Sequence, residues 1–101
     1  MDISDWRKKV DDVDIRLTSL LNERAAAVIE IGRLKRGSRM PIYEPDRERE
    51  VIENVQQSSK GPLTERDLAQ IYERLIDVMR SIQKNEIVPE SGPQAHETEI
   101  D

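Results

Sequence analysis

An apolar stripe runs through the first 36 residues of the chain, at alternating steps of three and four. Arg24 occupies its one polar slot, and its apolar members are Ile3, Trp6, Val10, Val13, Leu17, Leu20, Ala27, Ile31 and Leu34. This spacing predicts one amphipathic helix that Asp2 or Ser4 caps and Gly37 ends. The helix would be about 50 Å long, whereas a globule of this size has a radius of gyration of about 13 Å. One small chain cannot cover such a stripe, so we expect a dimer.

Two shorter helices are expected after a loop at residues 37–43. The first begins at Glu44-Pro45-Asp46, where proline fits the first helical position and acids suit the helix dipole. The second follows Thr64, an N-cap with Asp67 three residues on, and ends near Lys84. The sequence has no strand candidate, so the predicted fold class is all-α: three helices, of which the N-terminal one is very long.

Composition excludes several classes of protein. With no Cys and one His, the chain cannot form a disulfide, and a zinc site is not expected. No apolar run reaches the length of a membrane span, and the N-terminus has no secretory signal, so we expect a cytoplasmic location without membrane binding. The net charge of −5 comes mostly from the C-terminal residues. We expect a near-neutral helical domain at 1–86, a disordered acidic tail at 87–101, and no nucleic-acid binding.

Polar side chains stand on the apolar faces of all three predicted helices. They are Arg24, Lys35, Arg47, Glu48 and Gln83. A single such residue has an ordinary explanation, namely an interior ion pair of Arg24 with Glu48 or a long side chain that reaches water. The set as a whole has more cations than acids, which favours a pocket for an anion with carboxylate groups. Both interpretations remain open on these residues alone.

Four segments together resemble the all-helical (AroQ-class) chorismate mutases over residues 5–84. They are Arg7-Lys8-Lys9-Val10-Asp11-Asp12-Val13-Asp14, Leu20-Leu21-Asn22-Glu23-Arg24, Glu30-Ile31-Gly32-Arg33-Leu34-Lys35 and Pro41-Ile42-Tyr43-Glu44-Pro45-Asp46-Arg47-Glu48. The resemblance implies an intertwined homodimeric helical bundle. It also implies an enzyme that rearranges chorismate to prephenate, on the way to phenylalanine and tyrosine, without a cofactor or a metal.

The resemblance also implies roles for individual residues. Arg24 and Arg47 would hold the carboxylates of chorismate, helped by Arg7 from the other subunit. Lys35 and Gln83 would donate hydrogen bonds to the ether oxygen of the breaking bond. The resemblance implies a catalytic set of Lys35, Gln83 and Glu48.

Three further expectations concern the rim of this site. Glu48 would lie near the substrate hydroxyl, and Glu44, which stands where many members have Asp, would bind that hydroxyl. Met79 stands where some members have Ser, and we expect it to line the substrate site. Arg7 lies 28 residues from Lys35, or about 42 Å along a straight helix, so the two can touch one small ligand only across a dimer.

Two alternatives compete with the mutase. An isochorismate-pyruvate lyase could use the same scaffold, although the acidic pair Glu44 and Glu48 favours the mutase. A non-catalytic helical dimer could instead regulate the shikimate pathway. For the mutase itself, the resemblance also implies a possible partner enzyme from that pathway, because mutase domains of this kind occur fused or docked to such enzymes.

Overall fold

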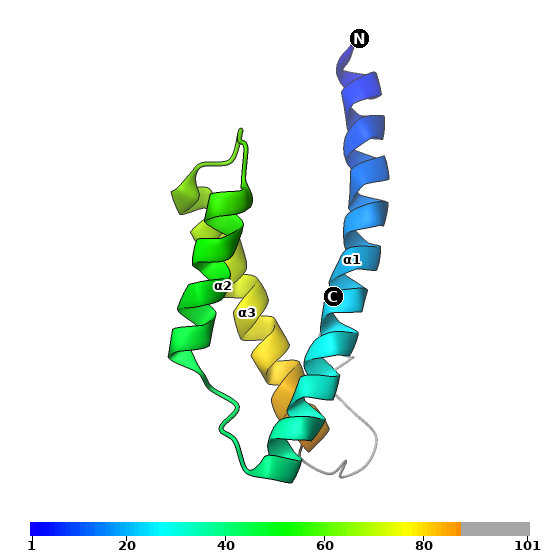
Figure 1. Ribbon diagram of the computed structural model, residues 1–101. Helices are drawn as coiled ribbons and strands as arrows, with labels where there is room; N and C mark the ends of the chain where they lie inside the picture. The colour runs from blue at the N-terminus through cyan, green and yellow to red at the C-terminus, as the bar shows by residue number, and fades with distance from the viewer. Residues whose placement is uncertain (88–101) are drawn as a thin grey trace.

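The computed structural model describes residues 1–87, which form three α-helices and no strand. They are α1 (Ile3–Ser38), α2 (Pro45–Ser58) and α3 (Glu65–Ile87). The all-α prediction is confirmed. In Figure 1, α1 rises as a separate arm while α2 and α3 form a second arm, and the two arms meet at their lower ends. The predicted acidic tail lies outside the described residues except for Ile87, which ends α3.

Helix α1 begins as predicted and ends later than predicted. Asp2 is its N-cap and forms a capping box with Asp5, with two hydrogen bonds of 3.0 Å. Gly37 was expected to end the helix, but this prediction is wrong because the helix continues to Ser38. Arg39 takes the left-handed conformation instead, with φ 62°. Pro41 disfavours a helical conformation at Met40, so the chain has to leave the helix before that residue.

The starts of α2 and α3 are confirmed. Pro45 is the first residue of α2. At the start of α3, the Asp67 backbone N–H donates to Thr64 Oγ1 at 3.0 Å, and the Thr64 N–H donates to the Asp67 carboxylate at 3.2 Å. This reciprocal pair satisfies two N–H groups that a helix start otherwise leaves without partners. Helix α3 extends three residues beyond the Lys84 expected from the sequence.

The core that the described residues form within one chain is small. Helix α3 packs on both α1 and α2, which do not pack on each other. The buried hydrophobic side chains are Ile76 and Met79, and the buried polar ones are Lys35 and Gln83. Half of this core is therefore polar, and it lies where α1 and α3 cross rather than along the whole of α1.

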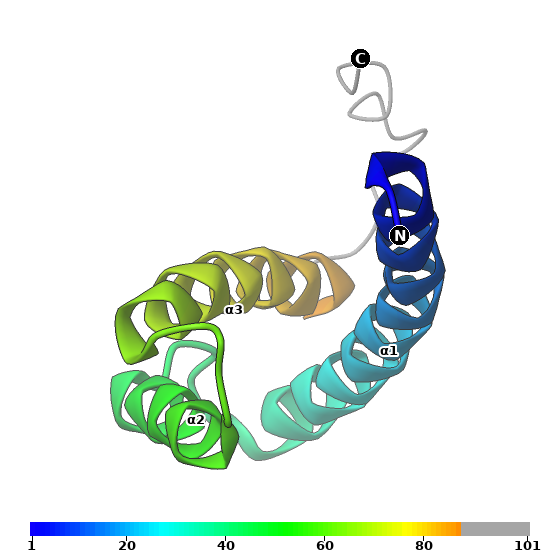
Figure 2. The same cartoon turned by 90° about the horizontal axis from the view of Figure 1, so that it is seen from above.

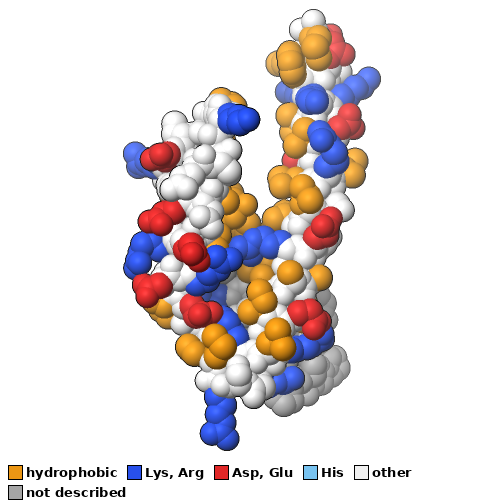
Figure 3. Space-filling view, viewed as in Figure 1, with side chains coloured by type: hydrophobic (Ala, Val, Ile, Leu, Met, Phe, Trp, Pro, Cys, Tyr) orange, Lys and Arg blue, Asp and Glu red, His pale blue; other side chains and the backbone are white. Residues whose placement is uncertain are grey.

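The N-terminal half of α1 has no cover within its own chain. Every residue from 1 to 20 is exposed, including Trp6 and Leu20, which are 56% and 59% exposed. Figure 3 shows a gap between the upper parts of the two arms and hydrophobic side chains along the α1 arm, and Figure 2 shows the same arms from above. The radius of gyration is 16.8 Å, against about 13 Å for a compact domain of this size. None of the described helices is both long and apolar enough to span a membrane.

Candidate active site

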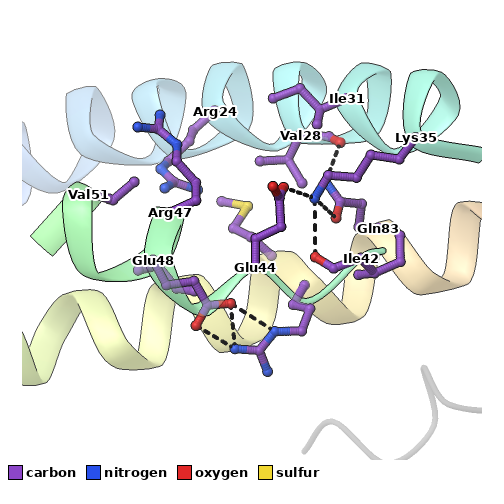
Figure 4. A pocket seen from close by; sticks show the side chains of 13 residues that line it. Arg24, Val28, Ile31, Lys35, Ile42, Glu44, Arg47, Glu48, Val51 and Gln83 are labelled. Carbon is purple, nitrogen blue, oxygen red and sulfur yellow. Dashed lines mark hydrogen bonds and ion pairs between the residues drawn. The ribbon is translucent and has the colours of Figure 1, made fainter. Parts of the chain in front are cut away.

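A cavity of about 170 Å³ lies where the two arms meet. Residues from all three helices and from the 42–44 segment line it, as Figure 4 shows. Its charged and amide side chains are Arg24, Lys35, Glu44, Arg47, Glu48, Arg80 and Gln83. The structure therefore brings together all five of the polar residues that the sequence placed on apolar faces, and adds Arg80. No cluster of His, Asp and Glu within residues 1–87 could hold a metal ion.

Lys35 is the most enclosed cation of the pocket, with 7% of its surface exposed. Its Nζ lies 2.7 Å from Glu44 Oε1, 3.1 Å from the carbonyl oxygen of Ile42 and 3.4 Å from Gln83 Oε1. An ammonium group has three N–H donors, and each faces one of these oxygens. Lys35 thus joins α1 to the 42–44 segment and to α3.

The amide of Gln83 is held on both of its sides. Its oxygen faces Lys35, and its Nε2 donates to the carbonyl oxygen of Val28 at 3.1 Å. Gly32 lies one turn after Val28, and a Cβ there would come within 2.6 Å of Gln83 Cγ. The missing side chain at Gly32 therefore lets α3 approach α1 closely enough for the Gln83 amide to reach both partners. The second Nε2 hydrogen stays available for a ligand.

Glu48 is bound by Arg80. Arg80 donates to both oxygens of the Glu48 carboxylate, at 2.7, 2.9 and 3.1 Å. The hydrogen bond with Glu48 raises the pKa of Arg80 above its ordinary value, so this guanidinium stays charged. The interior pair of Arg24 with Glu48, one alternative from the sequence, is therefore not formed.

Arg24 and Arg47 provide positive charge on the other side of the cavity. Figure 4 shows their side chains facing each other from α1 and α2. Arg47 pairs with the exposed Glu50 at 2.7 Å, whereas no acid among residues 1–87 pairs with Arg24. The lining holds four cations and two acids, a surplus of two positive charges. Arginine side chains suit carboxylates, which they can bind with two parallel hydrogen bonds.

Of the two remaining predicted site residues, Met79 lies in the cavity wall and Arg7 lies outside the cavity. Met79 lines the cavity and is 6% exposed. Arg7 lies on the uncovered part of α1 and is absent from the cavity lining of its own chain. The single chain thus assembles seven of the eight predicted binding residues around one space and leaves Arg7 outside it.

Residues 6–84 match the family model described as chorismate mutase type II. The chain belongs to this family. A bifunctional chorismate mutase/prephenate dehydratase of Aquifex aeolicus is 34% identical over 98 residues, which cover 93% of this chain and 27% of that protein. The chain thus spans about a quarter of the length of the bifunctional relatives it matches.

Two further relatives match the chain over most of their own length. A chorismate mutase of Methanocaldococcus jannaschii is 24% identical, and the match covers 81% of this chain and 84% of that protein. The crystal structure of chorismate mutase from Helicobacter pylori in complex with prephenate has a TM-score of 0.77 and 27% identity, and covers 84% of this chain and 92% of that one. The three-helix fold described above is therefore a known chorismate mutase fold.

Arg80 is the pocket residue that the sequence analysis missed in this chorismate mutase family member. It follows the buried Met79 and stands four residues after Ile76, so it lies at the edge of the apolar face of α3. Its partner Glu48 is 32 residues away. The position next to the apolar face was a usable signal, but an arginine there also has an ordinary explanation, namely a long side chain that reaches water.

Proposed function

We propose that this chain is a chorismate mutase that converts chorismate to prephenate. The observation that carries the proposal is the pair of excess positive charges in a pocket where Lys35 and Gln83 place buried hydrogen-bond donors. Chorismate is a dicarboxylate, so it balances that charge. The family membership and the prephenate bound to the Helicobacter pylori relative support the same reaction. The names of the bifunctional relatives support a partner enzyme that acts on prephenate.

The reaction is an intramolecular [3,3] rearrangement in which one ether C–O bond breaks and one C–C bond forms. It needs no nucleophile and no proton transfer. Arg24 and Arg47 hold the two carboxylates so that the reacting carbons approach, which reduces the entropic part of the barrier. Negative charge grows on the ether oxygen as the bond breaks, and Lys35 Nζ and Gln83 Nε2 stabilise it by hydrogen bonds. Glu44 accepts the hydrogen bond of the substrate hydroxyl, and Glu48 lies near that hydroxyl.

The active form is proposed to be an intertwined homodimer. The uncovered stripe on α1 supports this, because residues 1–20 have no cover within one chain. Arg7 would then reach the pocket of the other subunit and add a further cation near a substrate carboxylate. Within its own chain, Arg7 stands 28 residues before Lys35 on the same helix.

The test of this function is an assay of the purified chain with chorismate. We expect the chorismate absorbance to fall and the product to be identified as prephenate. Arg24→Ala should lose this activity, because nothing else on α1 replaces the unpaired cation at that side of the pocket. Arg66→Ala is the matched control, because Arg66 is an exposed residue in the first turn of α3 and does not line the cavity.

Three other results would contradict the proposal. Pyruvate formed from isochorismate with no turnover of chorismate would establish the lyase. No reaction with either compound would indicate a binding or regulatory dimer. Equal activity of Arg24→Ala and the wild type would show that the carboxylates are bound elsewhere.

A further inference from the structure

We propose that Arg80 is a positioning residue that holds the Glu48 carboxylate in the wall of the substrate pocket. The proposal rests on the mutase function proposed above and deepens it. Arg80 itself would not bind the substrate. It would act through Glu48, and Tyr43 and Asp77 would in turn hold Arg80.

The contacts of Arg80 account for most of its donors. Its Nε and Nη2 donate to the two Glu48 oxygens, and its Nη1 donates to Asp77 Oδ1 at 3.1 Å. Its Cζ lies 4.8 Å from the centre of the Tyr43 ring, which is a favourable place for a cation over an aromatic face. A guanidinium is rigid and planar, so contacts on three sides fix its orientation as well as its position.

The burial of the pair gives these contacts weight. The side chains of Arg80 and Glu48 are 27% and 24% exposed, whereas the Arg47 and Glu50 side chains are 59% and 60% exposed. Solvent weakens exposed pairs much more than partly buried ones. Hydrogen bonds between two charged groups are also among the stronger hydrogen bonds in proteins. The Arg80 pair is thus suited to hold a side chain in one conformation.

Arg80 also joins three parts of the pocket wall. Tyr43 belongs to the segment before α2, Glu48 to the first turn of α2, and Asp77 and Arg80 to α3. Since α2 packs on α3 and not on α1, this contact ties the first turn of α2 to α3, as the Lys35–Glu44 pair ties the residue before α2 to α1. Without Arg80, the Glu48 carboxylate would be an unpaired charge beside an anionic substrate, and it would turn toward water.

The two acids of the pocket, Glu44 and Glu48, are therefore held by two different cations. The two acids are four residues apart; Glu44 pairs with Lys35 and Glu48 pairs with Arg80. With both acids of the lining neutralised by their own partners, Arg24 and Arg47 remain to bind the substrate carboxylates, because the pair of Arg47 with Glu50 is largely exposed and therefore weak. This division of the charges explains how a pocket with two acids can still bind a dianion.

The test is a double-mutant cycle on kcat/KM for chorismate, with Arg80→Gln, Glu48→Gln and the double variant. We expect Arg80→Gln to lower kcat/KM by at least about tenfold, and by less than about twofold in the Glu48→Gln background. Arg80→Lys keeps the charge and loses the planar fork, so it should recover only part of the loss. Arg66→Gln is the control, because Arg66 is an exposed residue in the first turn of α3 that does not line the cavity, and its kcat/KM should match the wild type.

Two further measurements keep a structural effect apart from a positioning effect. Each variant is assayed well below its own melting temperature, where a loss of stability alone leaves the turnover unchanged. Tyr43→Leu removes the ring over which Arg80 lies and leaves the buried core intact. It should therefore lower kcat/KM in the wild type and not in the Glu48→Gln background, even if Arg80→Gln does not fold.

Each remaining outcome overturns the inference in a distinct way. Full activity of Arg80→Gln would mean that the pair only stabilises the fold. An undiminished loss in the Glu48→Gln background would mean that Arg80 contacts the substrate directly. If the wild-type chain itself left chorismate unchanged, the proposed function would fail first, and this inference would fail with it.

Discussion

In the proposed mechanism, the Lys35 ammonium group exchanges one protein partner for the substrate when the pocket fills. Of its three contacts, the one to Gln83 Oε1 is the longest, at 3.4 Å, and the one to Glu44 is the shortest, at 2.7 Å. The ether oxygen would therefore replace Gln83 as an acceptor, while Glu44 keeps the ammonium in place. A donor that is already fixed by two other contacts has little reorganisation to undergo during the reaction.

Replacing Lys35 by alanine should lower kcat by at least about 10²-fold, the scale for loss of one preorganised donor. The comparison is Lys60→Ala, which removes an exposed lysine from the segment between α2 and α3. Steady-state turnover of chorismate by both variants gives the result. A Lys35→Ala enzyme within a few-fold of the wild type would remove Lys35 from the mechanism.

Gly32 and Gly37 provide a matched pair of glycines on α1. Gly32→Ala places a Cβ 2.6 Å from Gln83 Cγ, whereas a Cβ at Gly37 meets nothing within 4 Å. We expect Gly32→Ala to destabilise the protein by about 1–3 kcal/mol and to lower kcat at least about tenfold, because the Gln83 amide is displaced. Gly37→Ala should instead be neutral or stabilising by up to about 1 kcal/mol. Urea unfolding and kcat measure both effects, and equal behaviour of the two variants would contradict the close approach.

Much of the cavity lining could be predicted from the sequence because five of its polar residues break a local rule. A charge or an amide at an apolar position, as at Arg24 or Gln83, is visible in a single helix. The partners of these residues were not visible. The pairing of Glu48 with Arg80 rather than Arg24, and that of Glu44 with Lys35, depends on how the helices cross. Gly32 gave no signal either, because a glycine within a helix has meaning only when the neighbouring helix is known.

At the scale of the helices, starts were easier to predict than ends. Asp2, Pro45 and Thr64 are residues with a strong positional preference, and each lies where its chemistry places it. The end of α1 was misplaced because Gly37 is the residue that usually takes a left-handed conformation, yet Arg39 takes it here. The restriction that Pro41 places on Met40 decided the position.

The left-handed conformation of Arg39 leads to a stability prediction. A residue with a side chain is strained in the left-handed region, and glycine is not, so Arg39→Gly should raise the free energy of unfolding by about 0.5–1 kcal/mol. Ser38→Gly, one residue earlier and helical, should lower it by about the same amount. Urea denaturation at one protein concentration compares the two. A loss of stability in both variants would argue against the strained residue at position 39.

At the scale of the whole molecule, the described chain leaves residues 1–20 of α1 and its N-terminus without cover. Leu17 lies on the uncovered stripe and is 47% exposed, while Ile15 is 70% exposed and lies about 160° around the helix from Leu17. Leu17→Asp should therefore dissociate the proposed dimer and abolish turnover, because it places a charge in the interface. Ile15→Asp should leave both unchanged. Sedimentation velocity gives the mass, and a dimeric Leu17→Asp protein would contradict the assembly.

The extension of α1 beyond its own pocket has a genetic consequence. Suppose that each pocket takes Arg24 from one subunit and Arg7 from the other. A mixed dimer can then form from one Arg7→Ala chain and one Arg24→Ala chain. Both substitutions then fall in the same pocket, and the other pocket is intact. Random reassortment of the two inactive proteins should therefore restore about a quarter of the wild-type pockets. Two alleles that fail singly would together support growth without added phenylalanine and tyrosine.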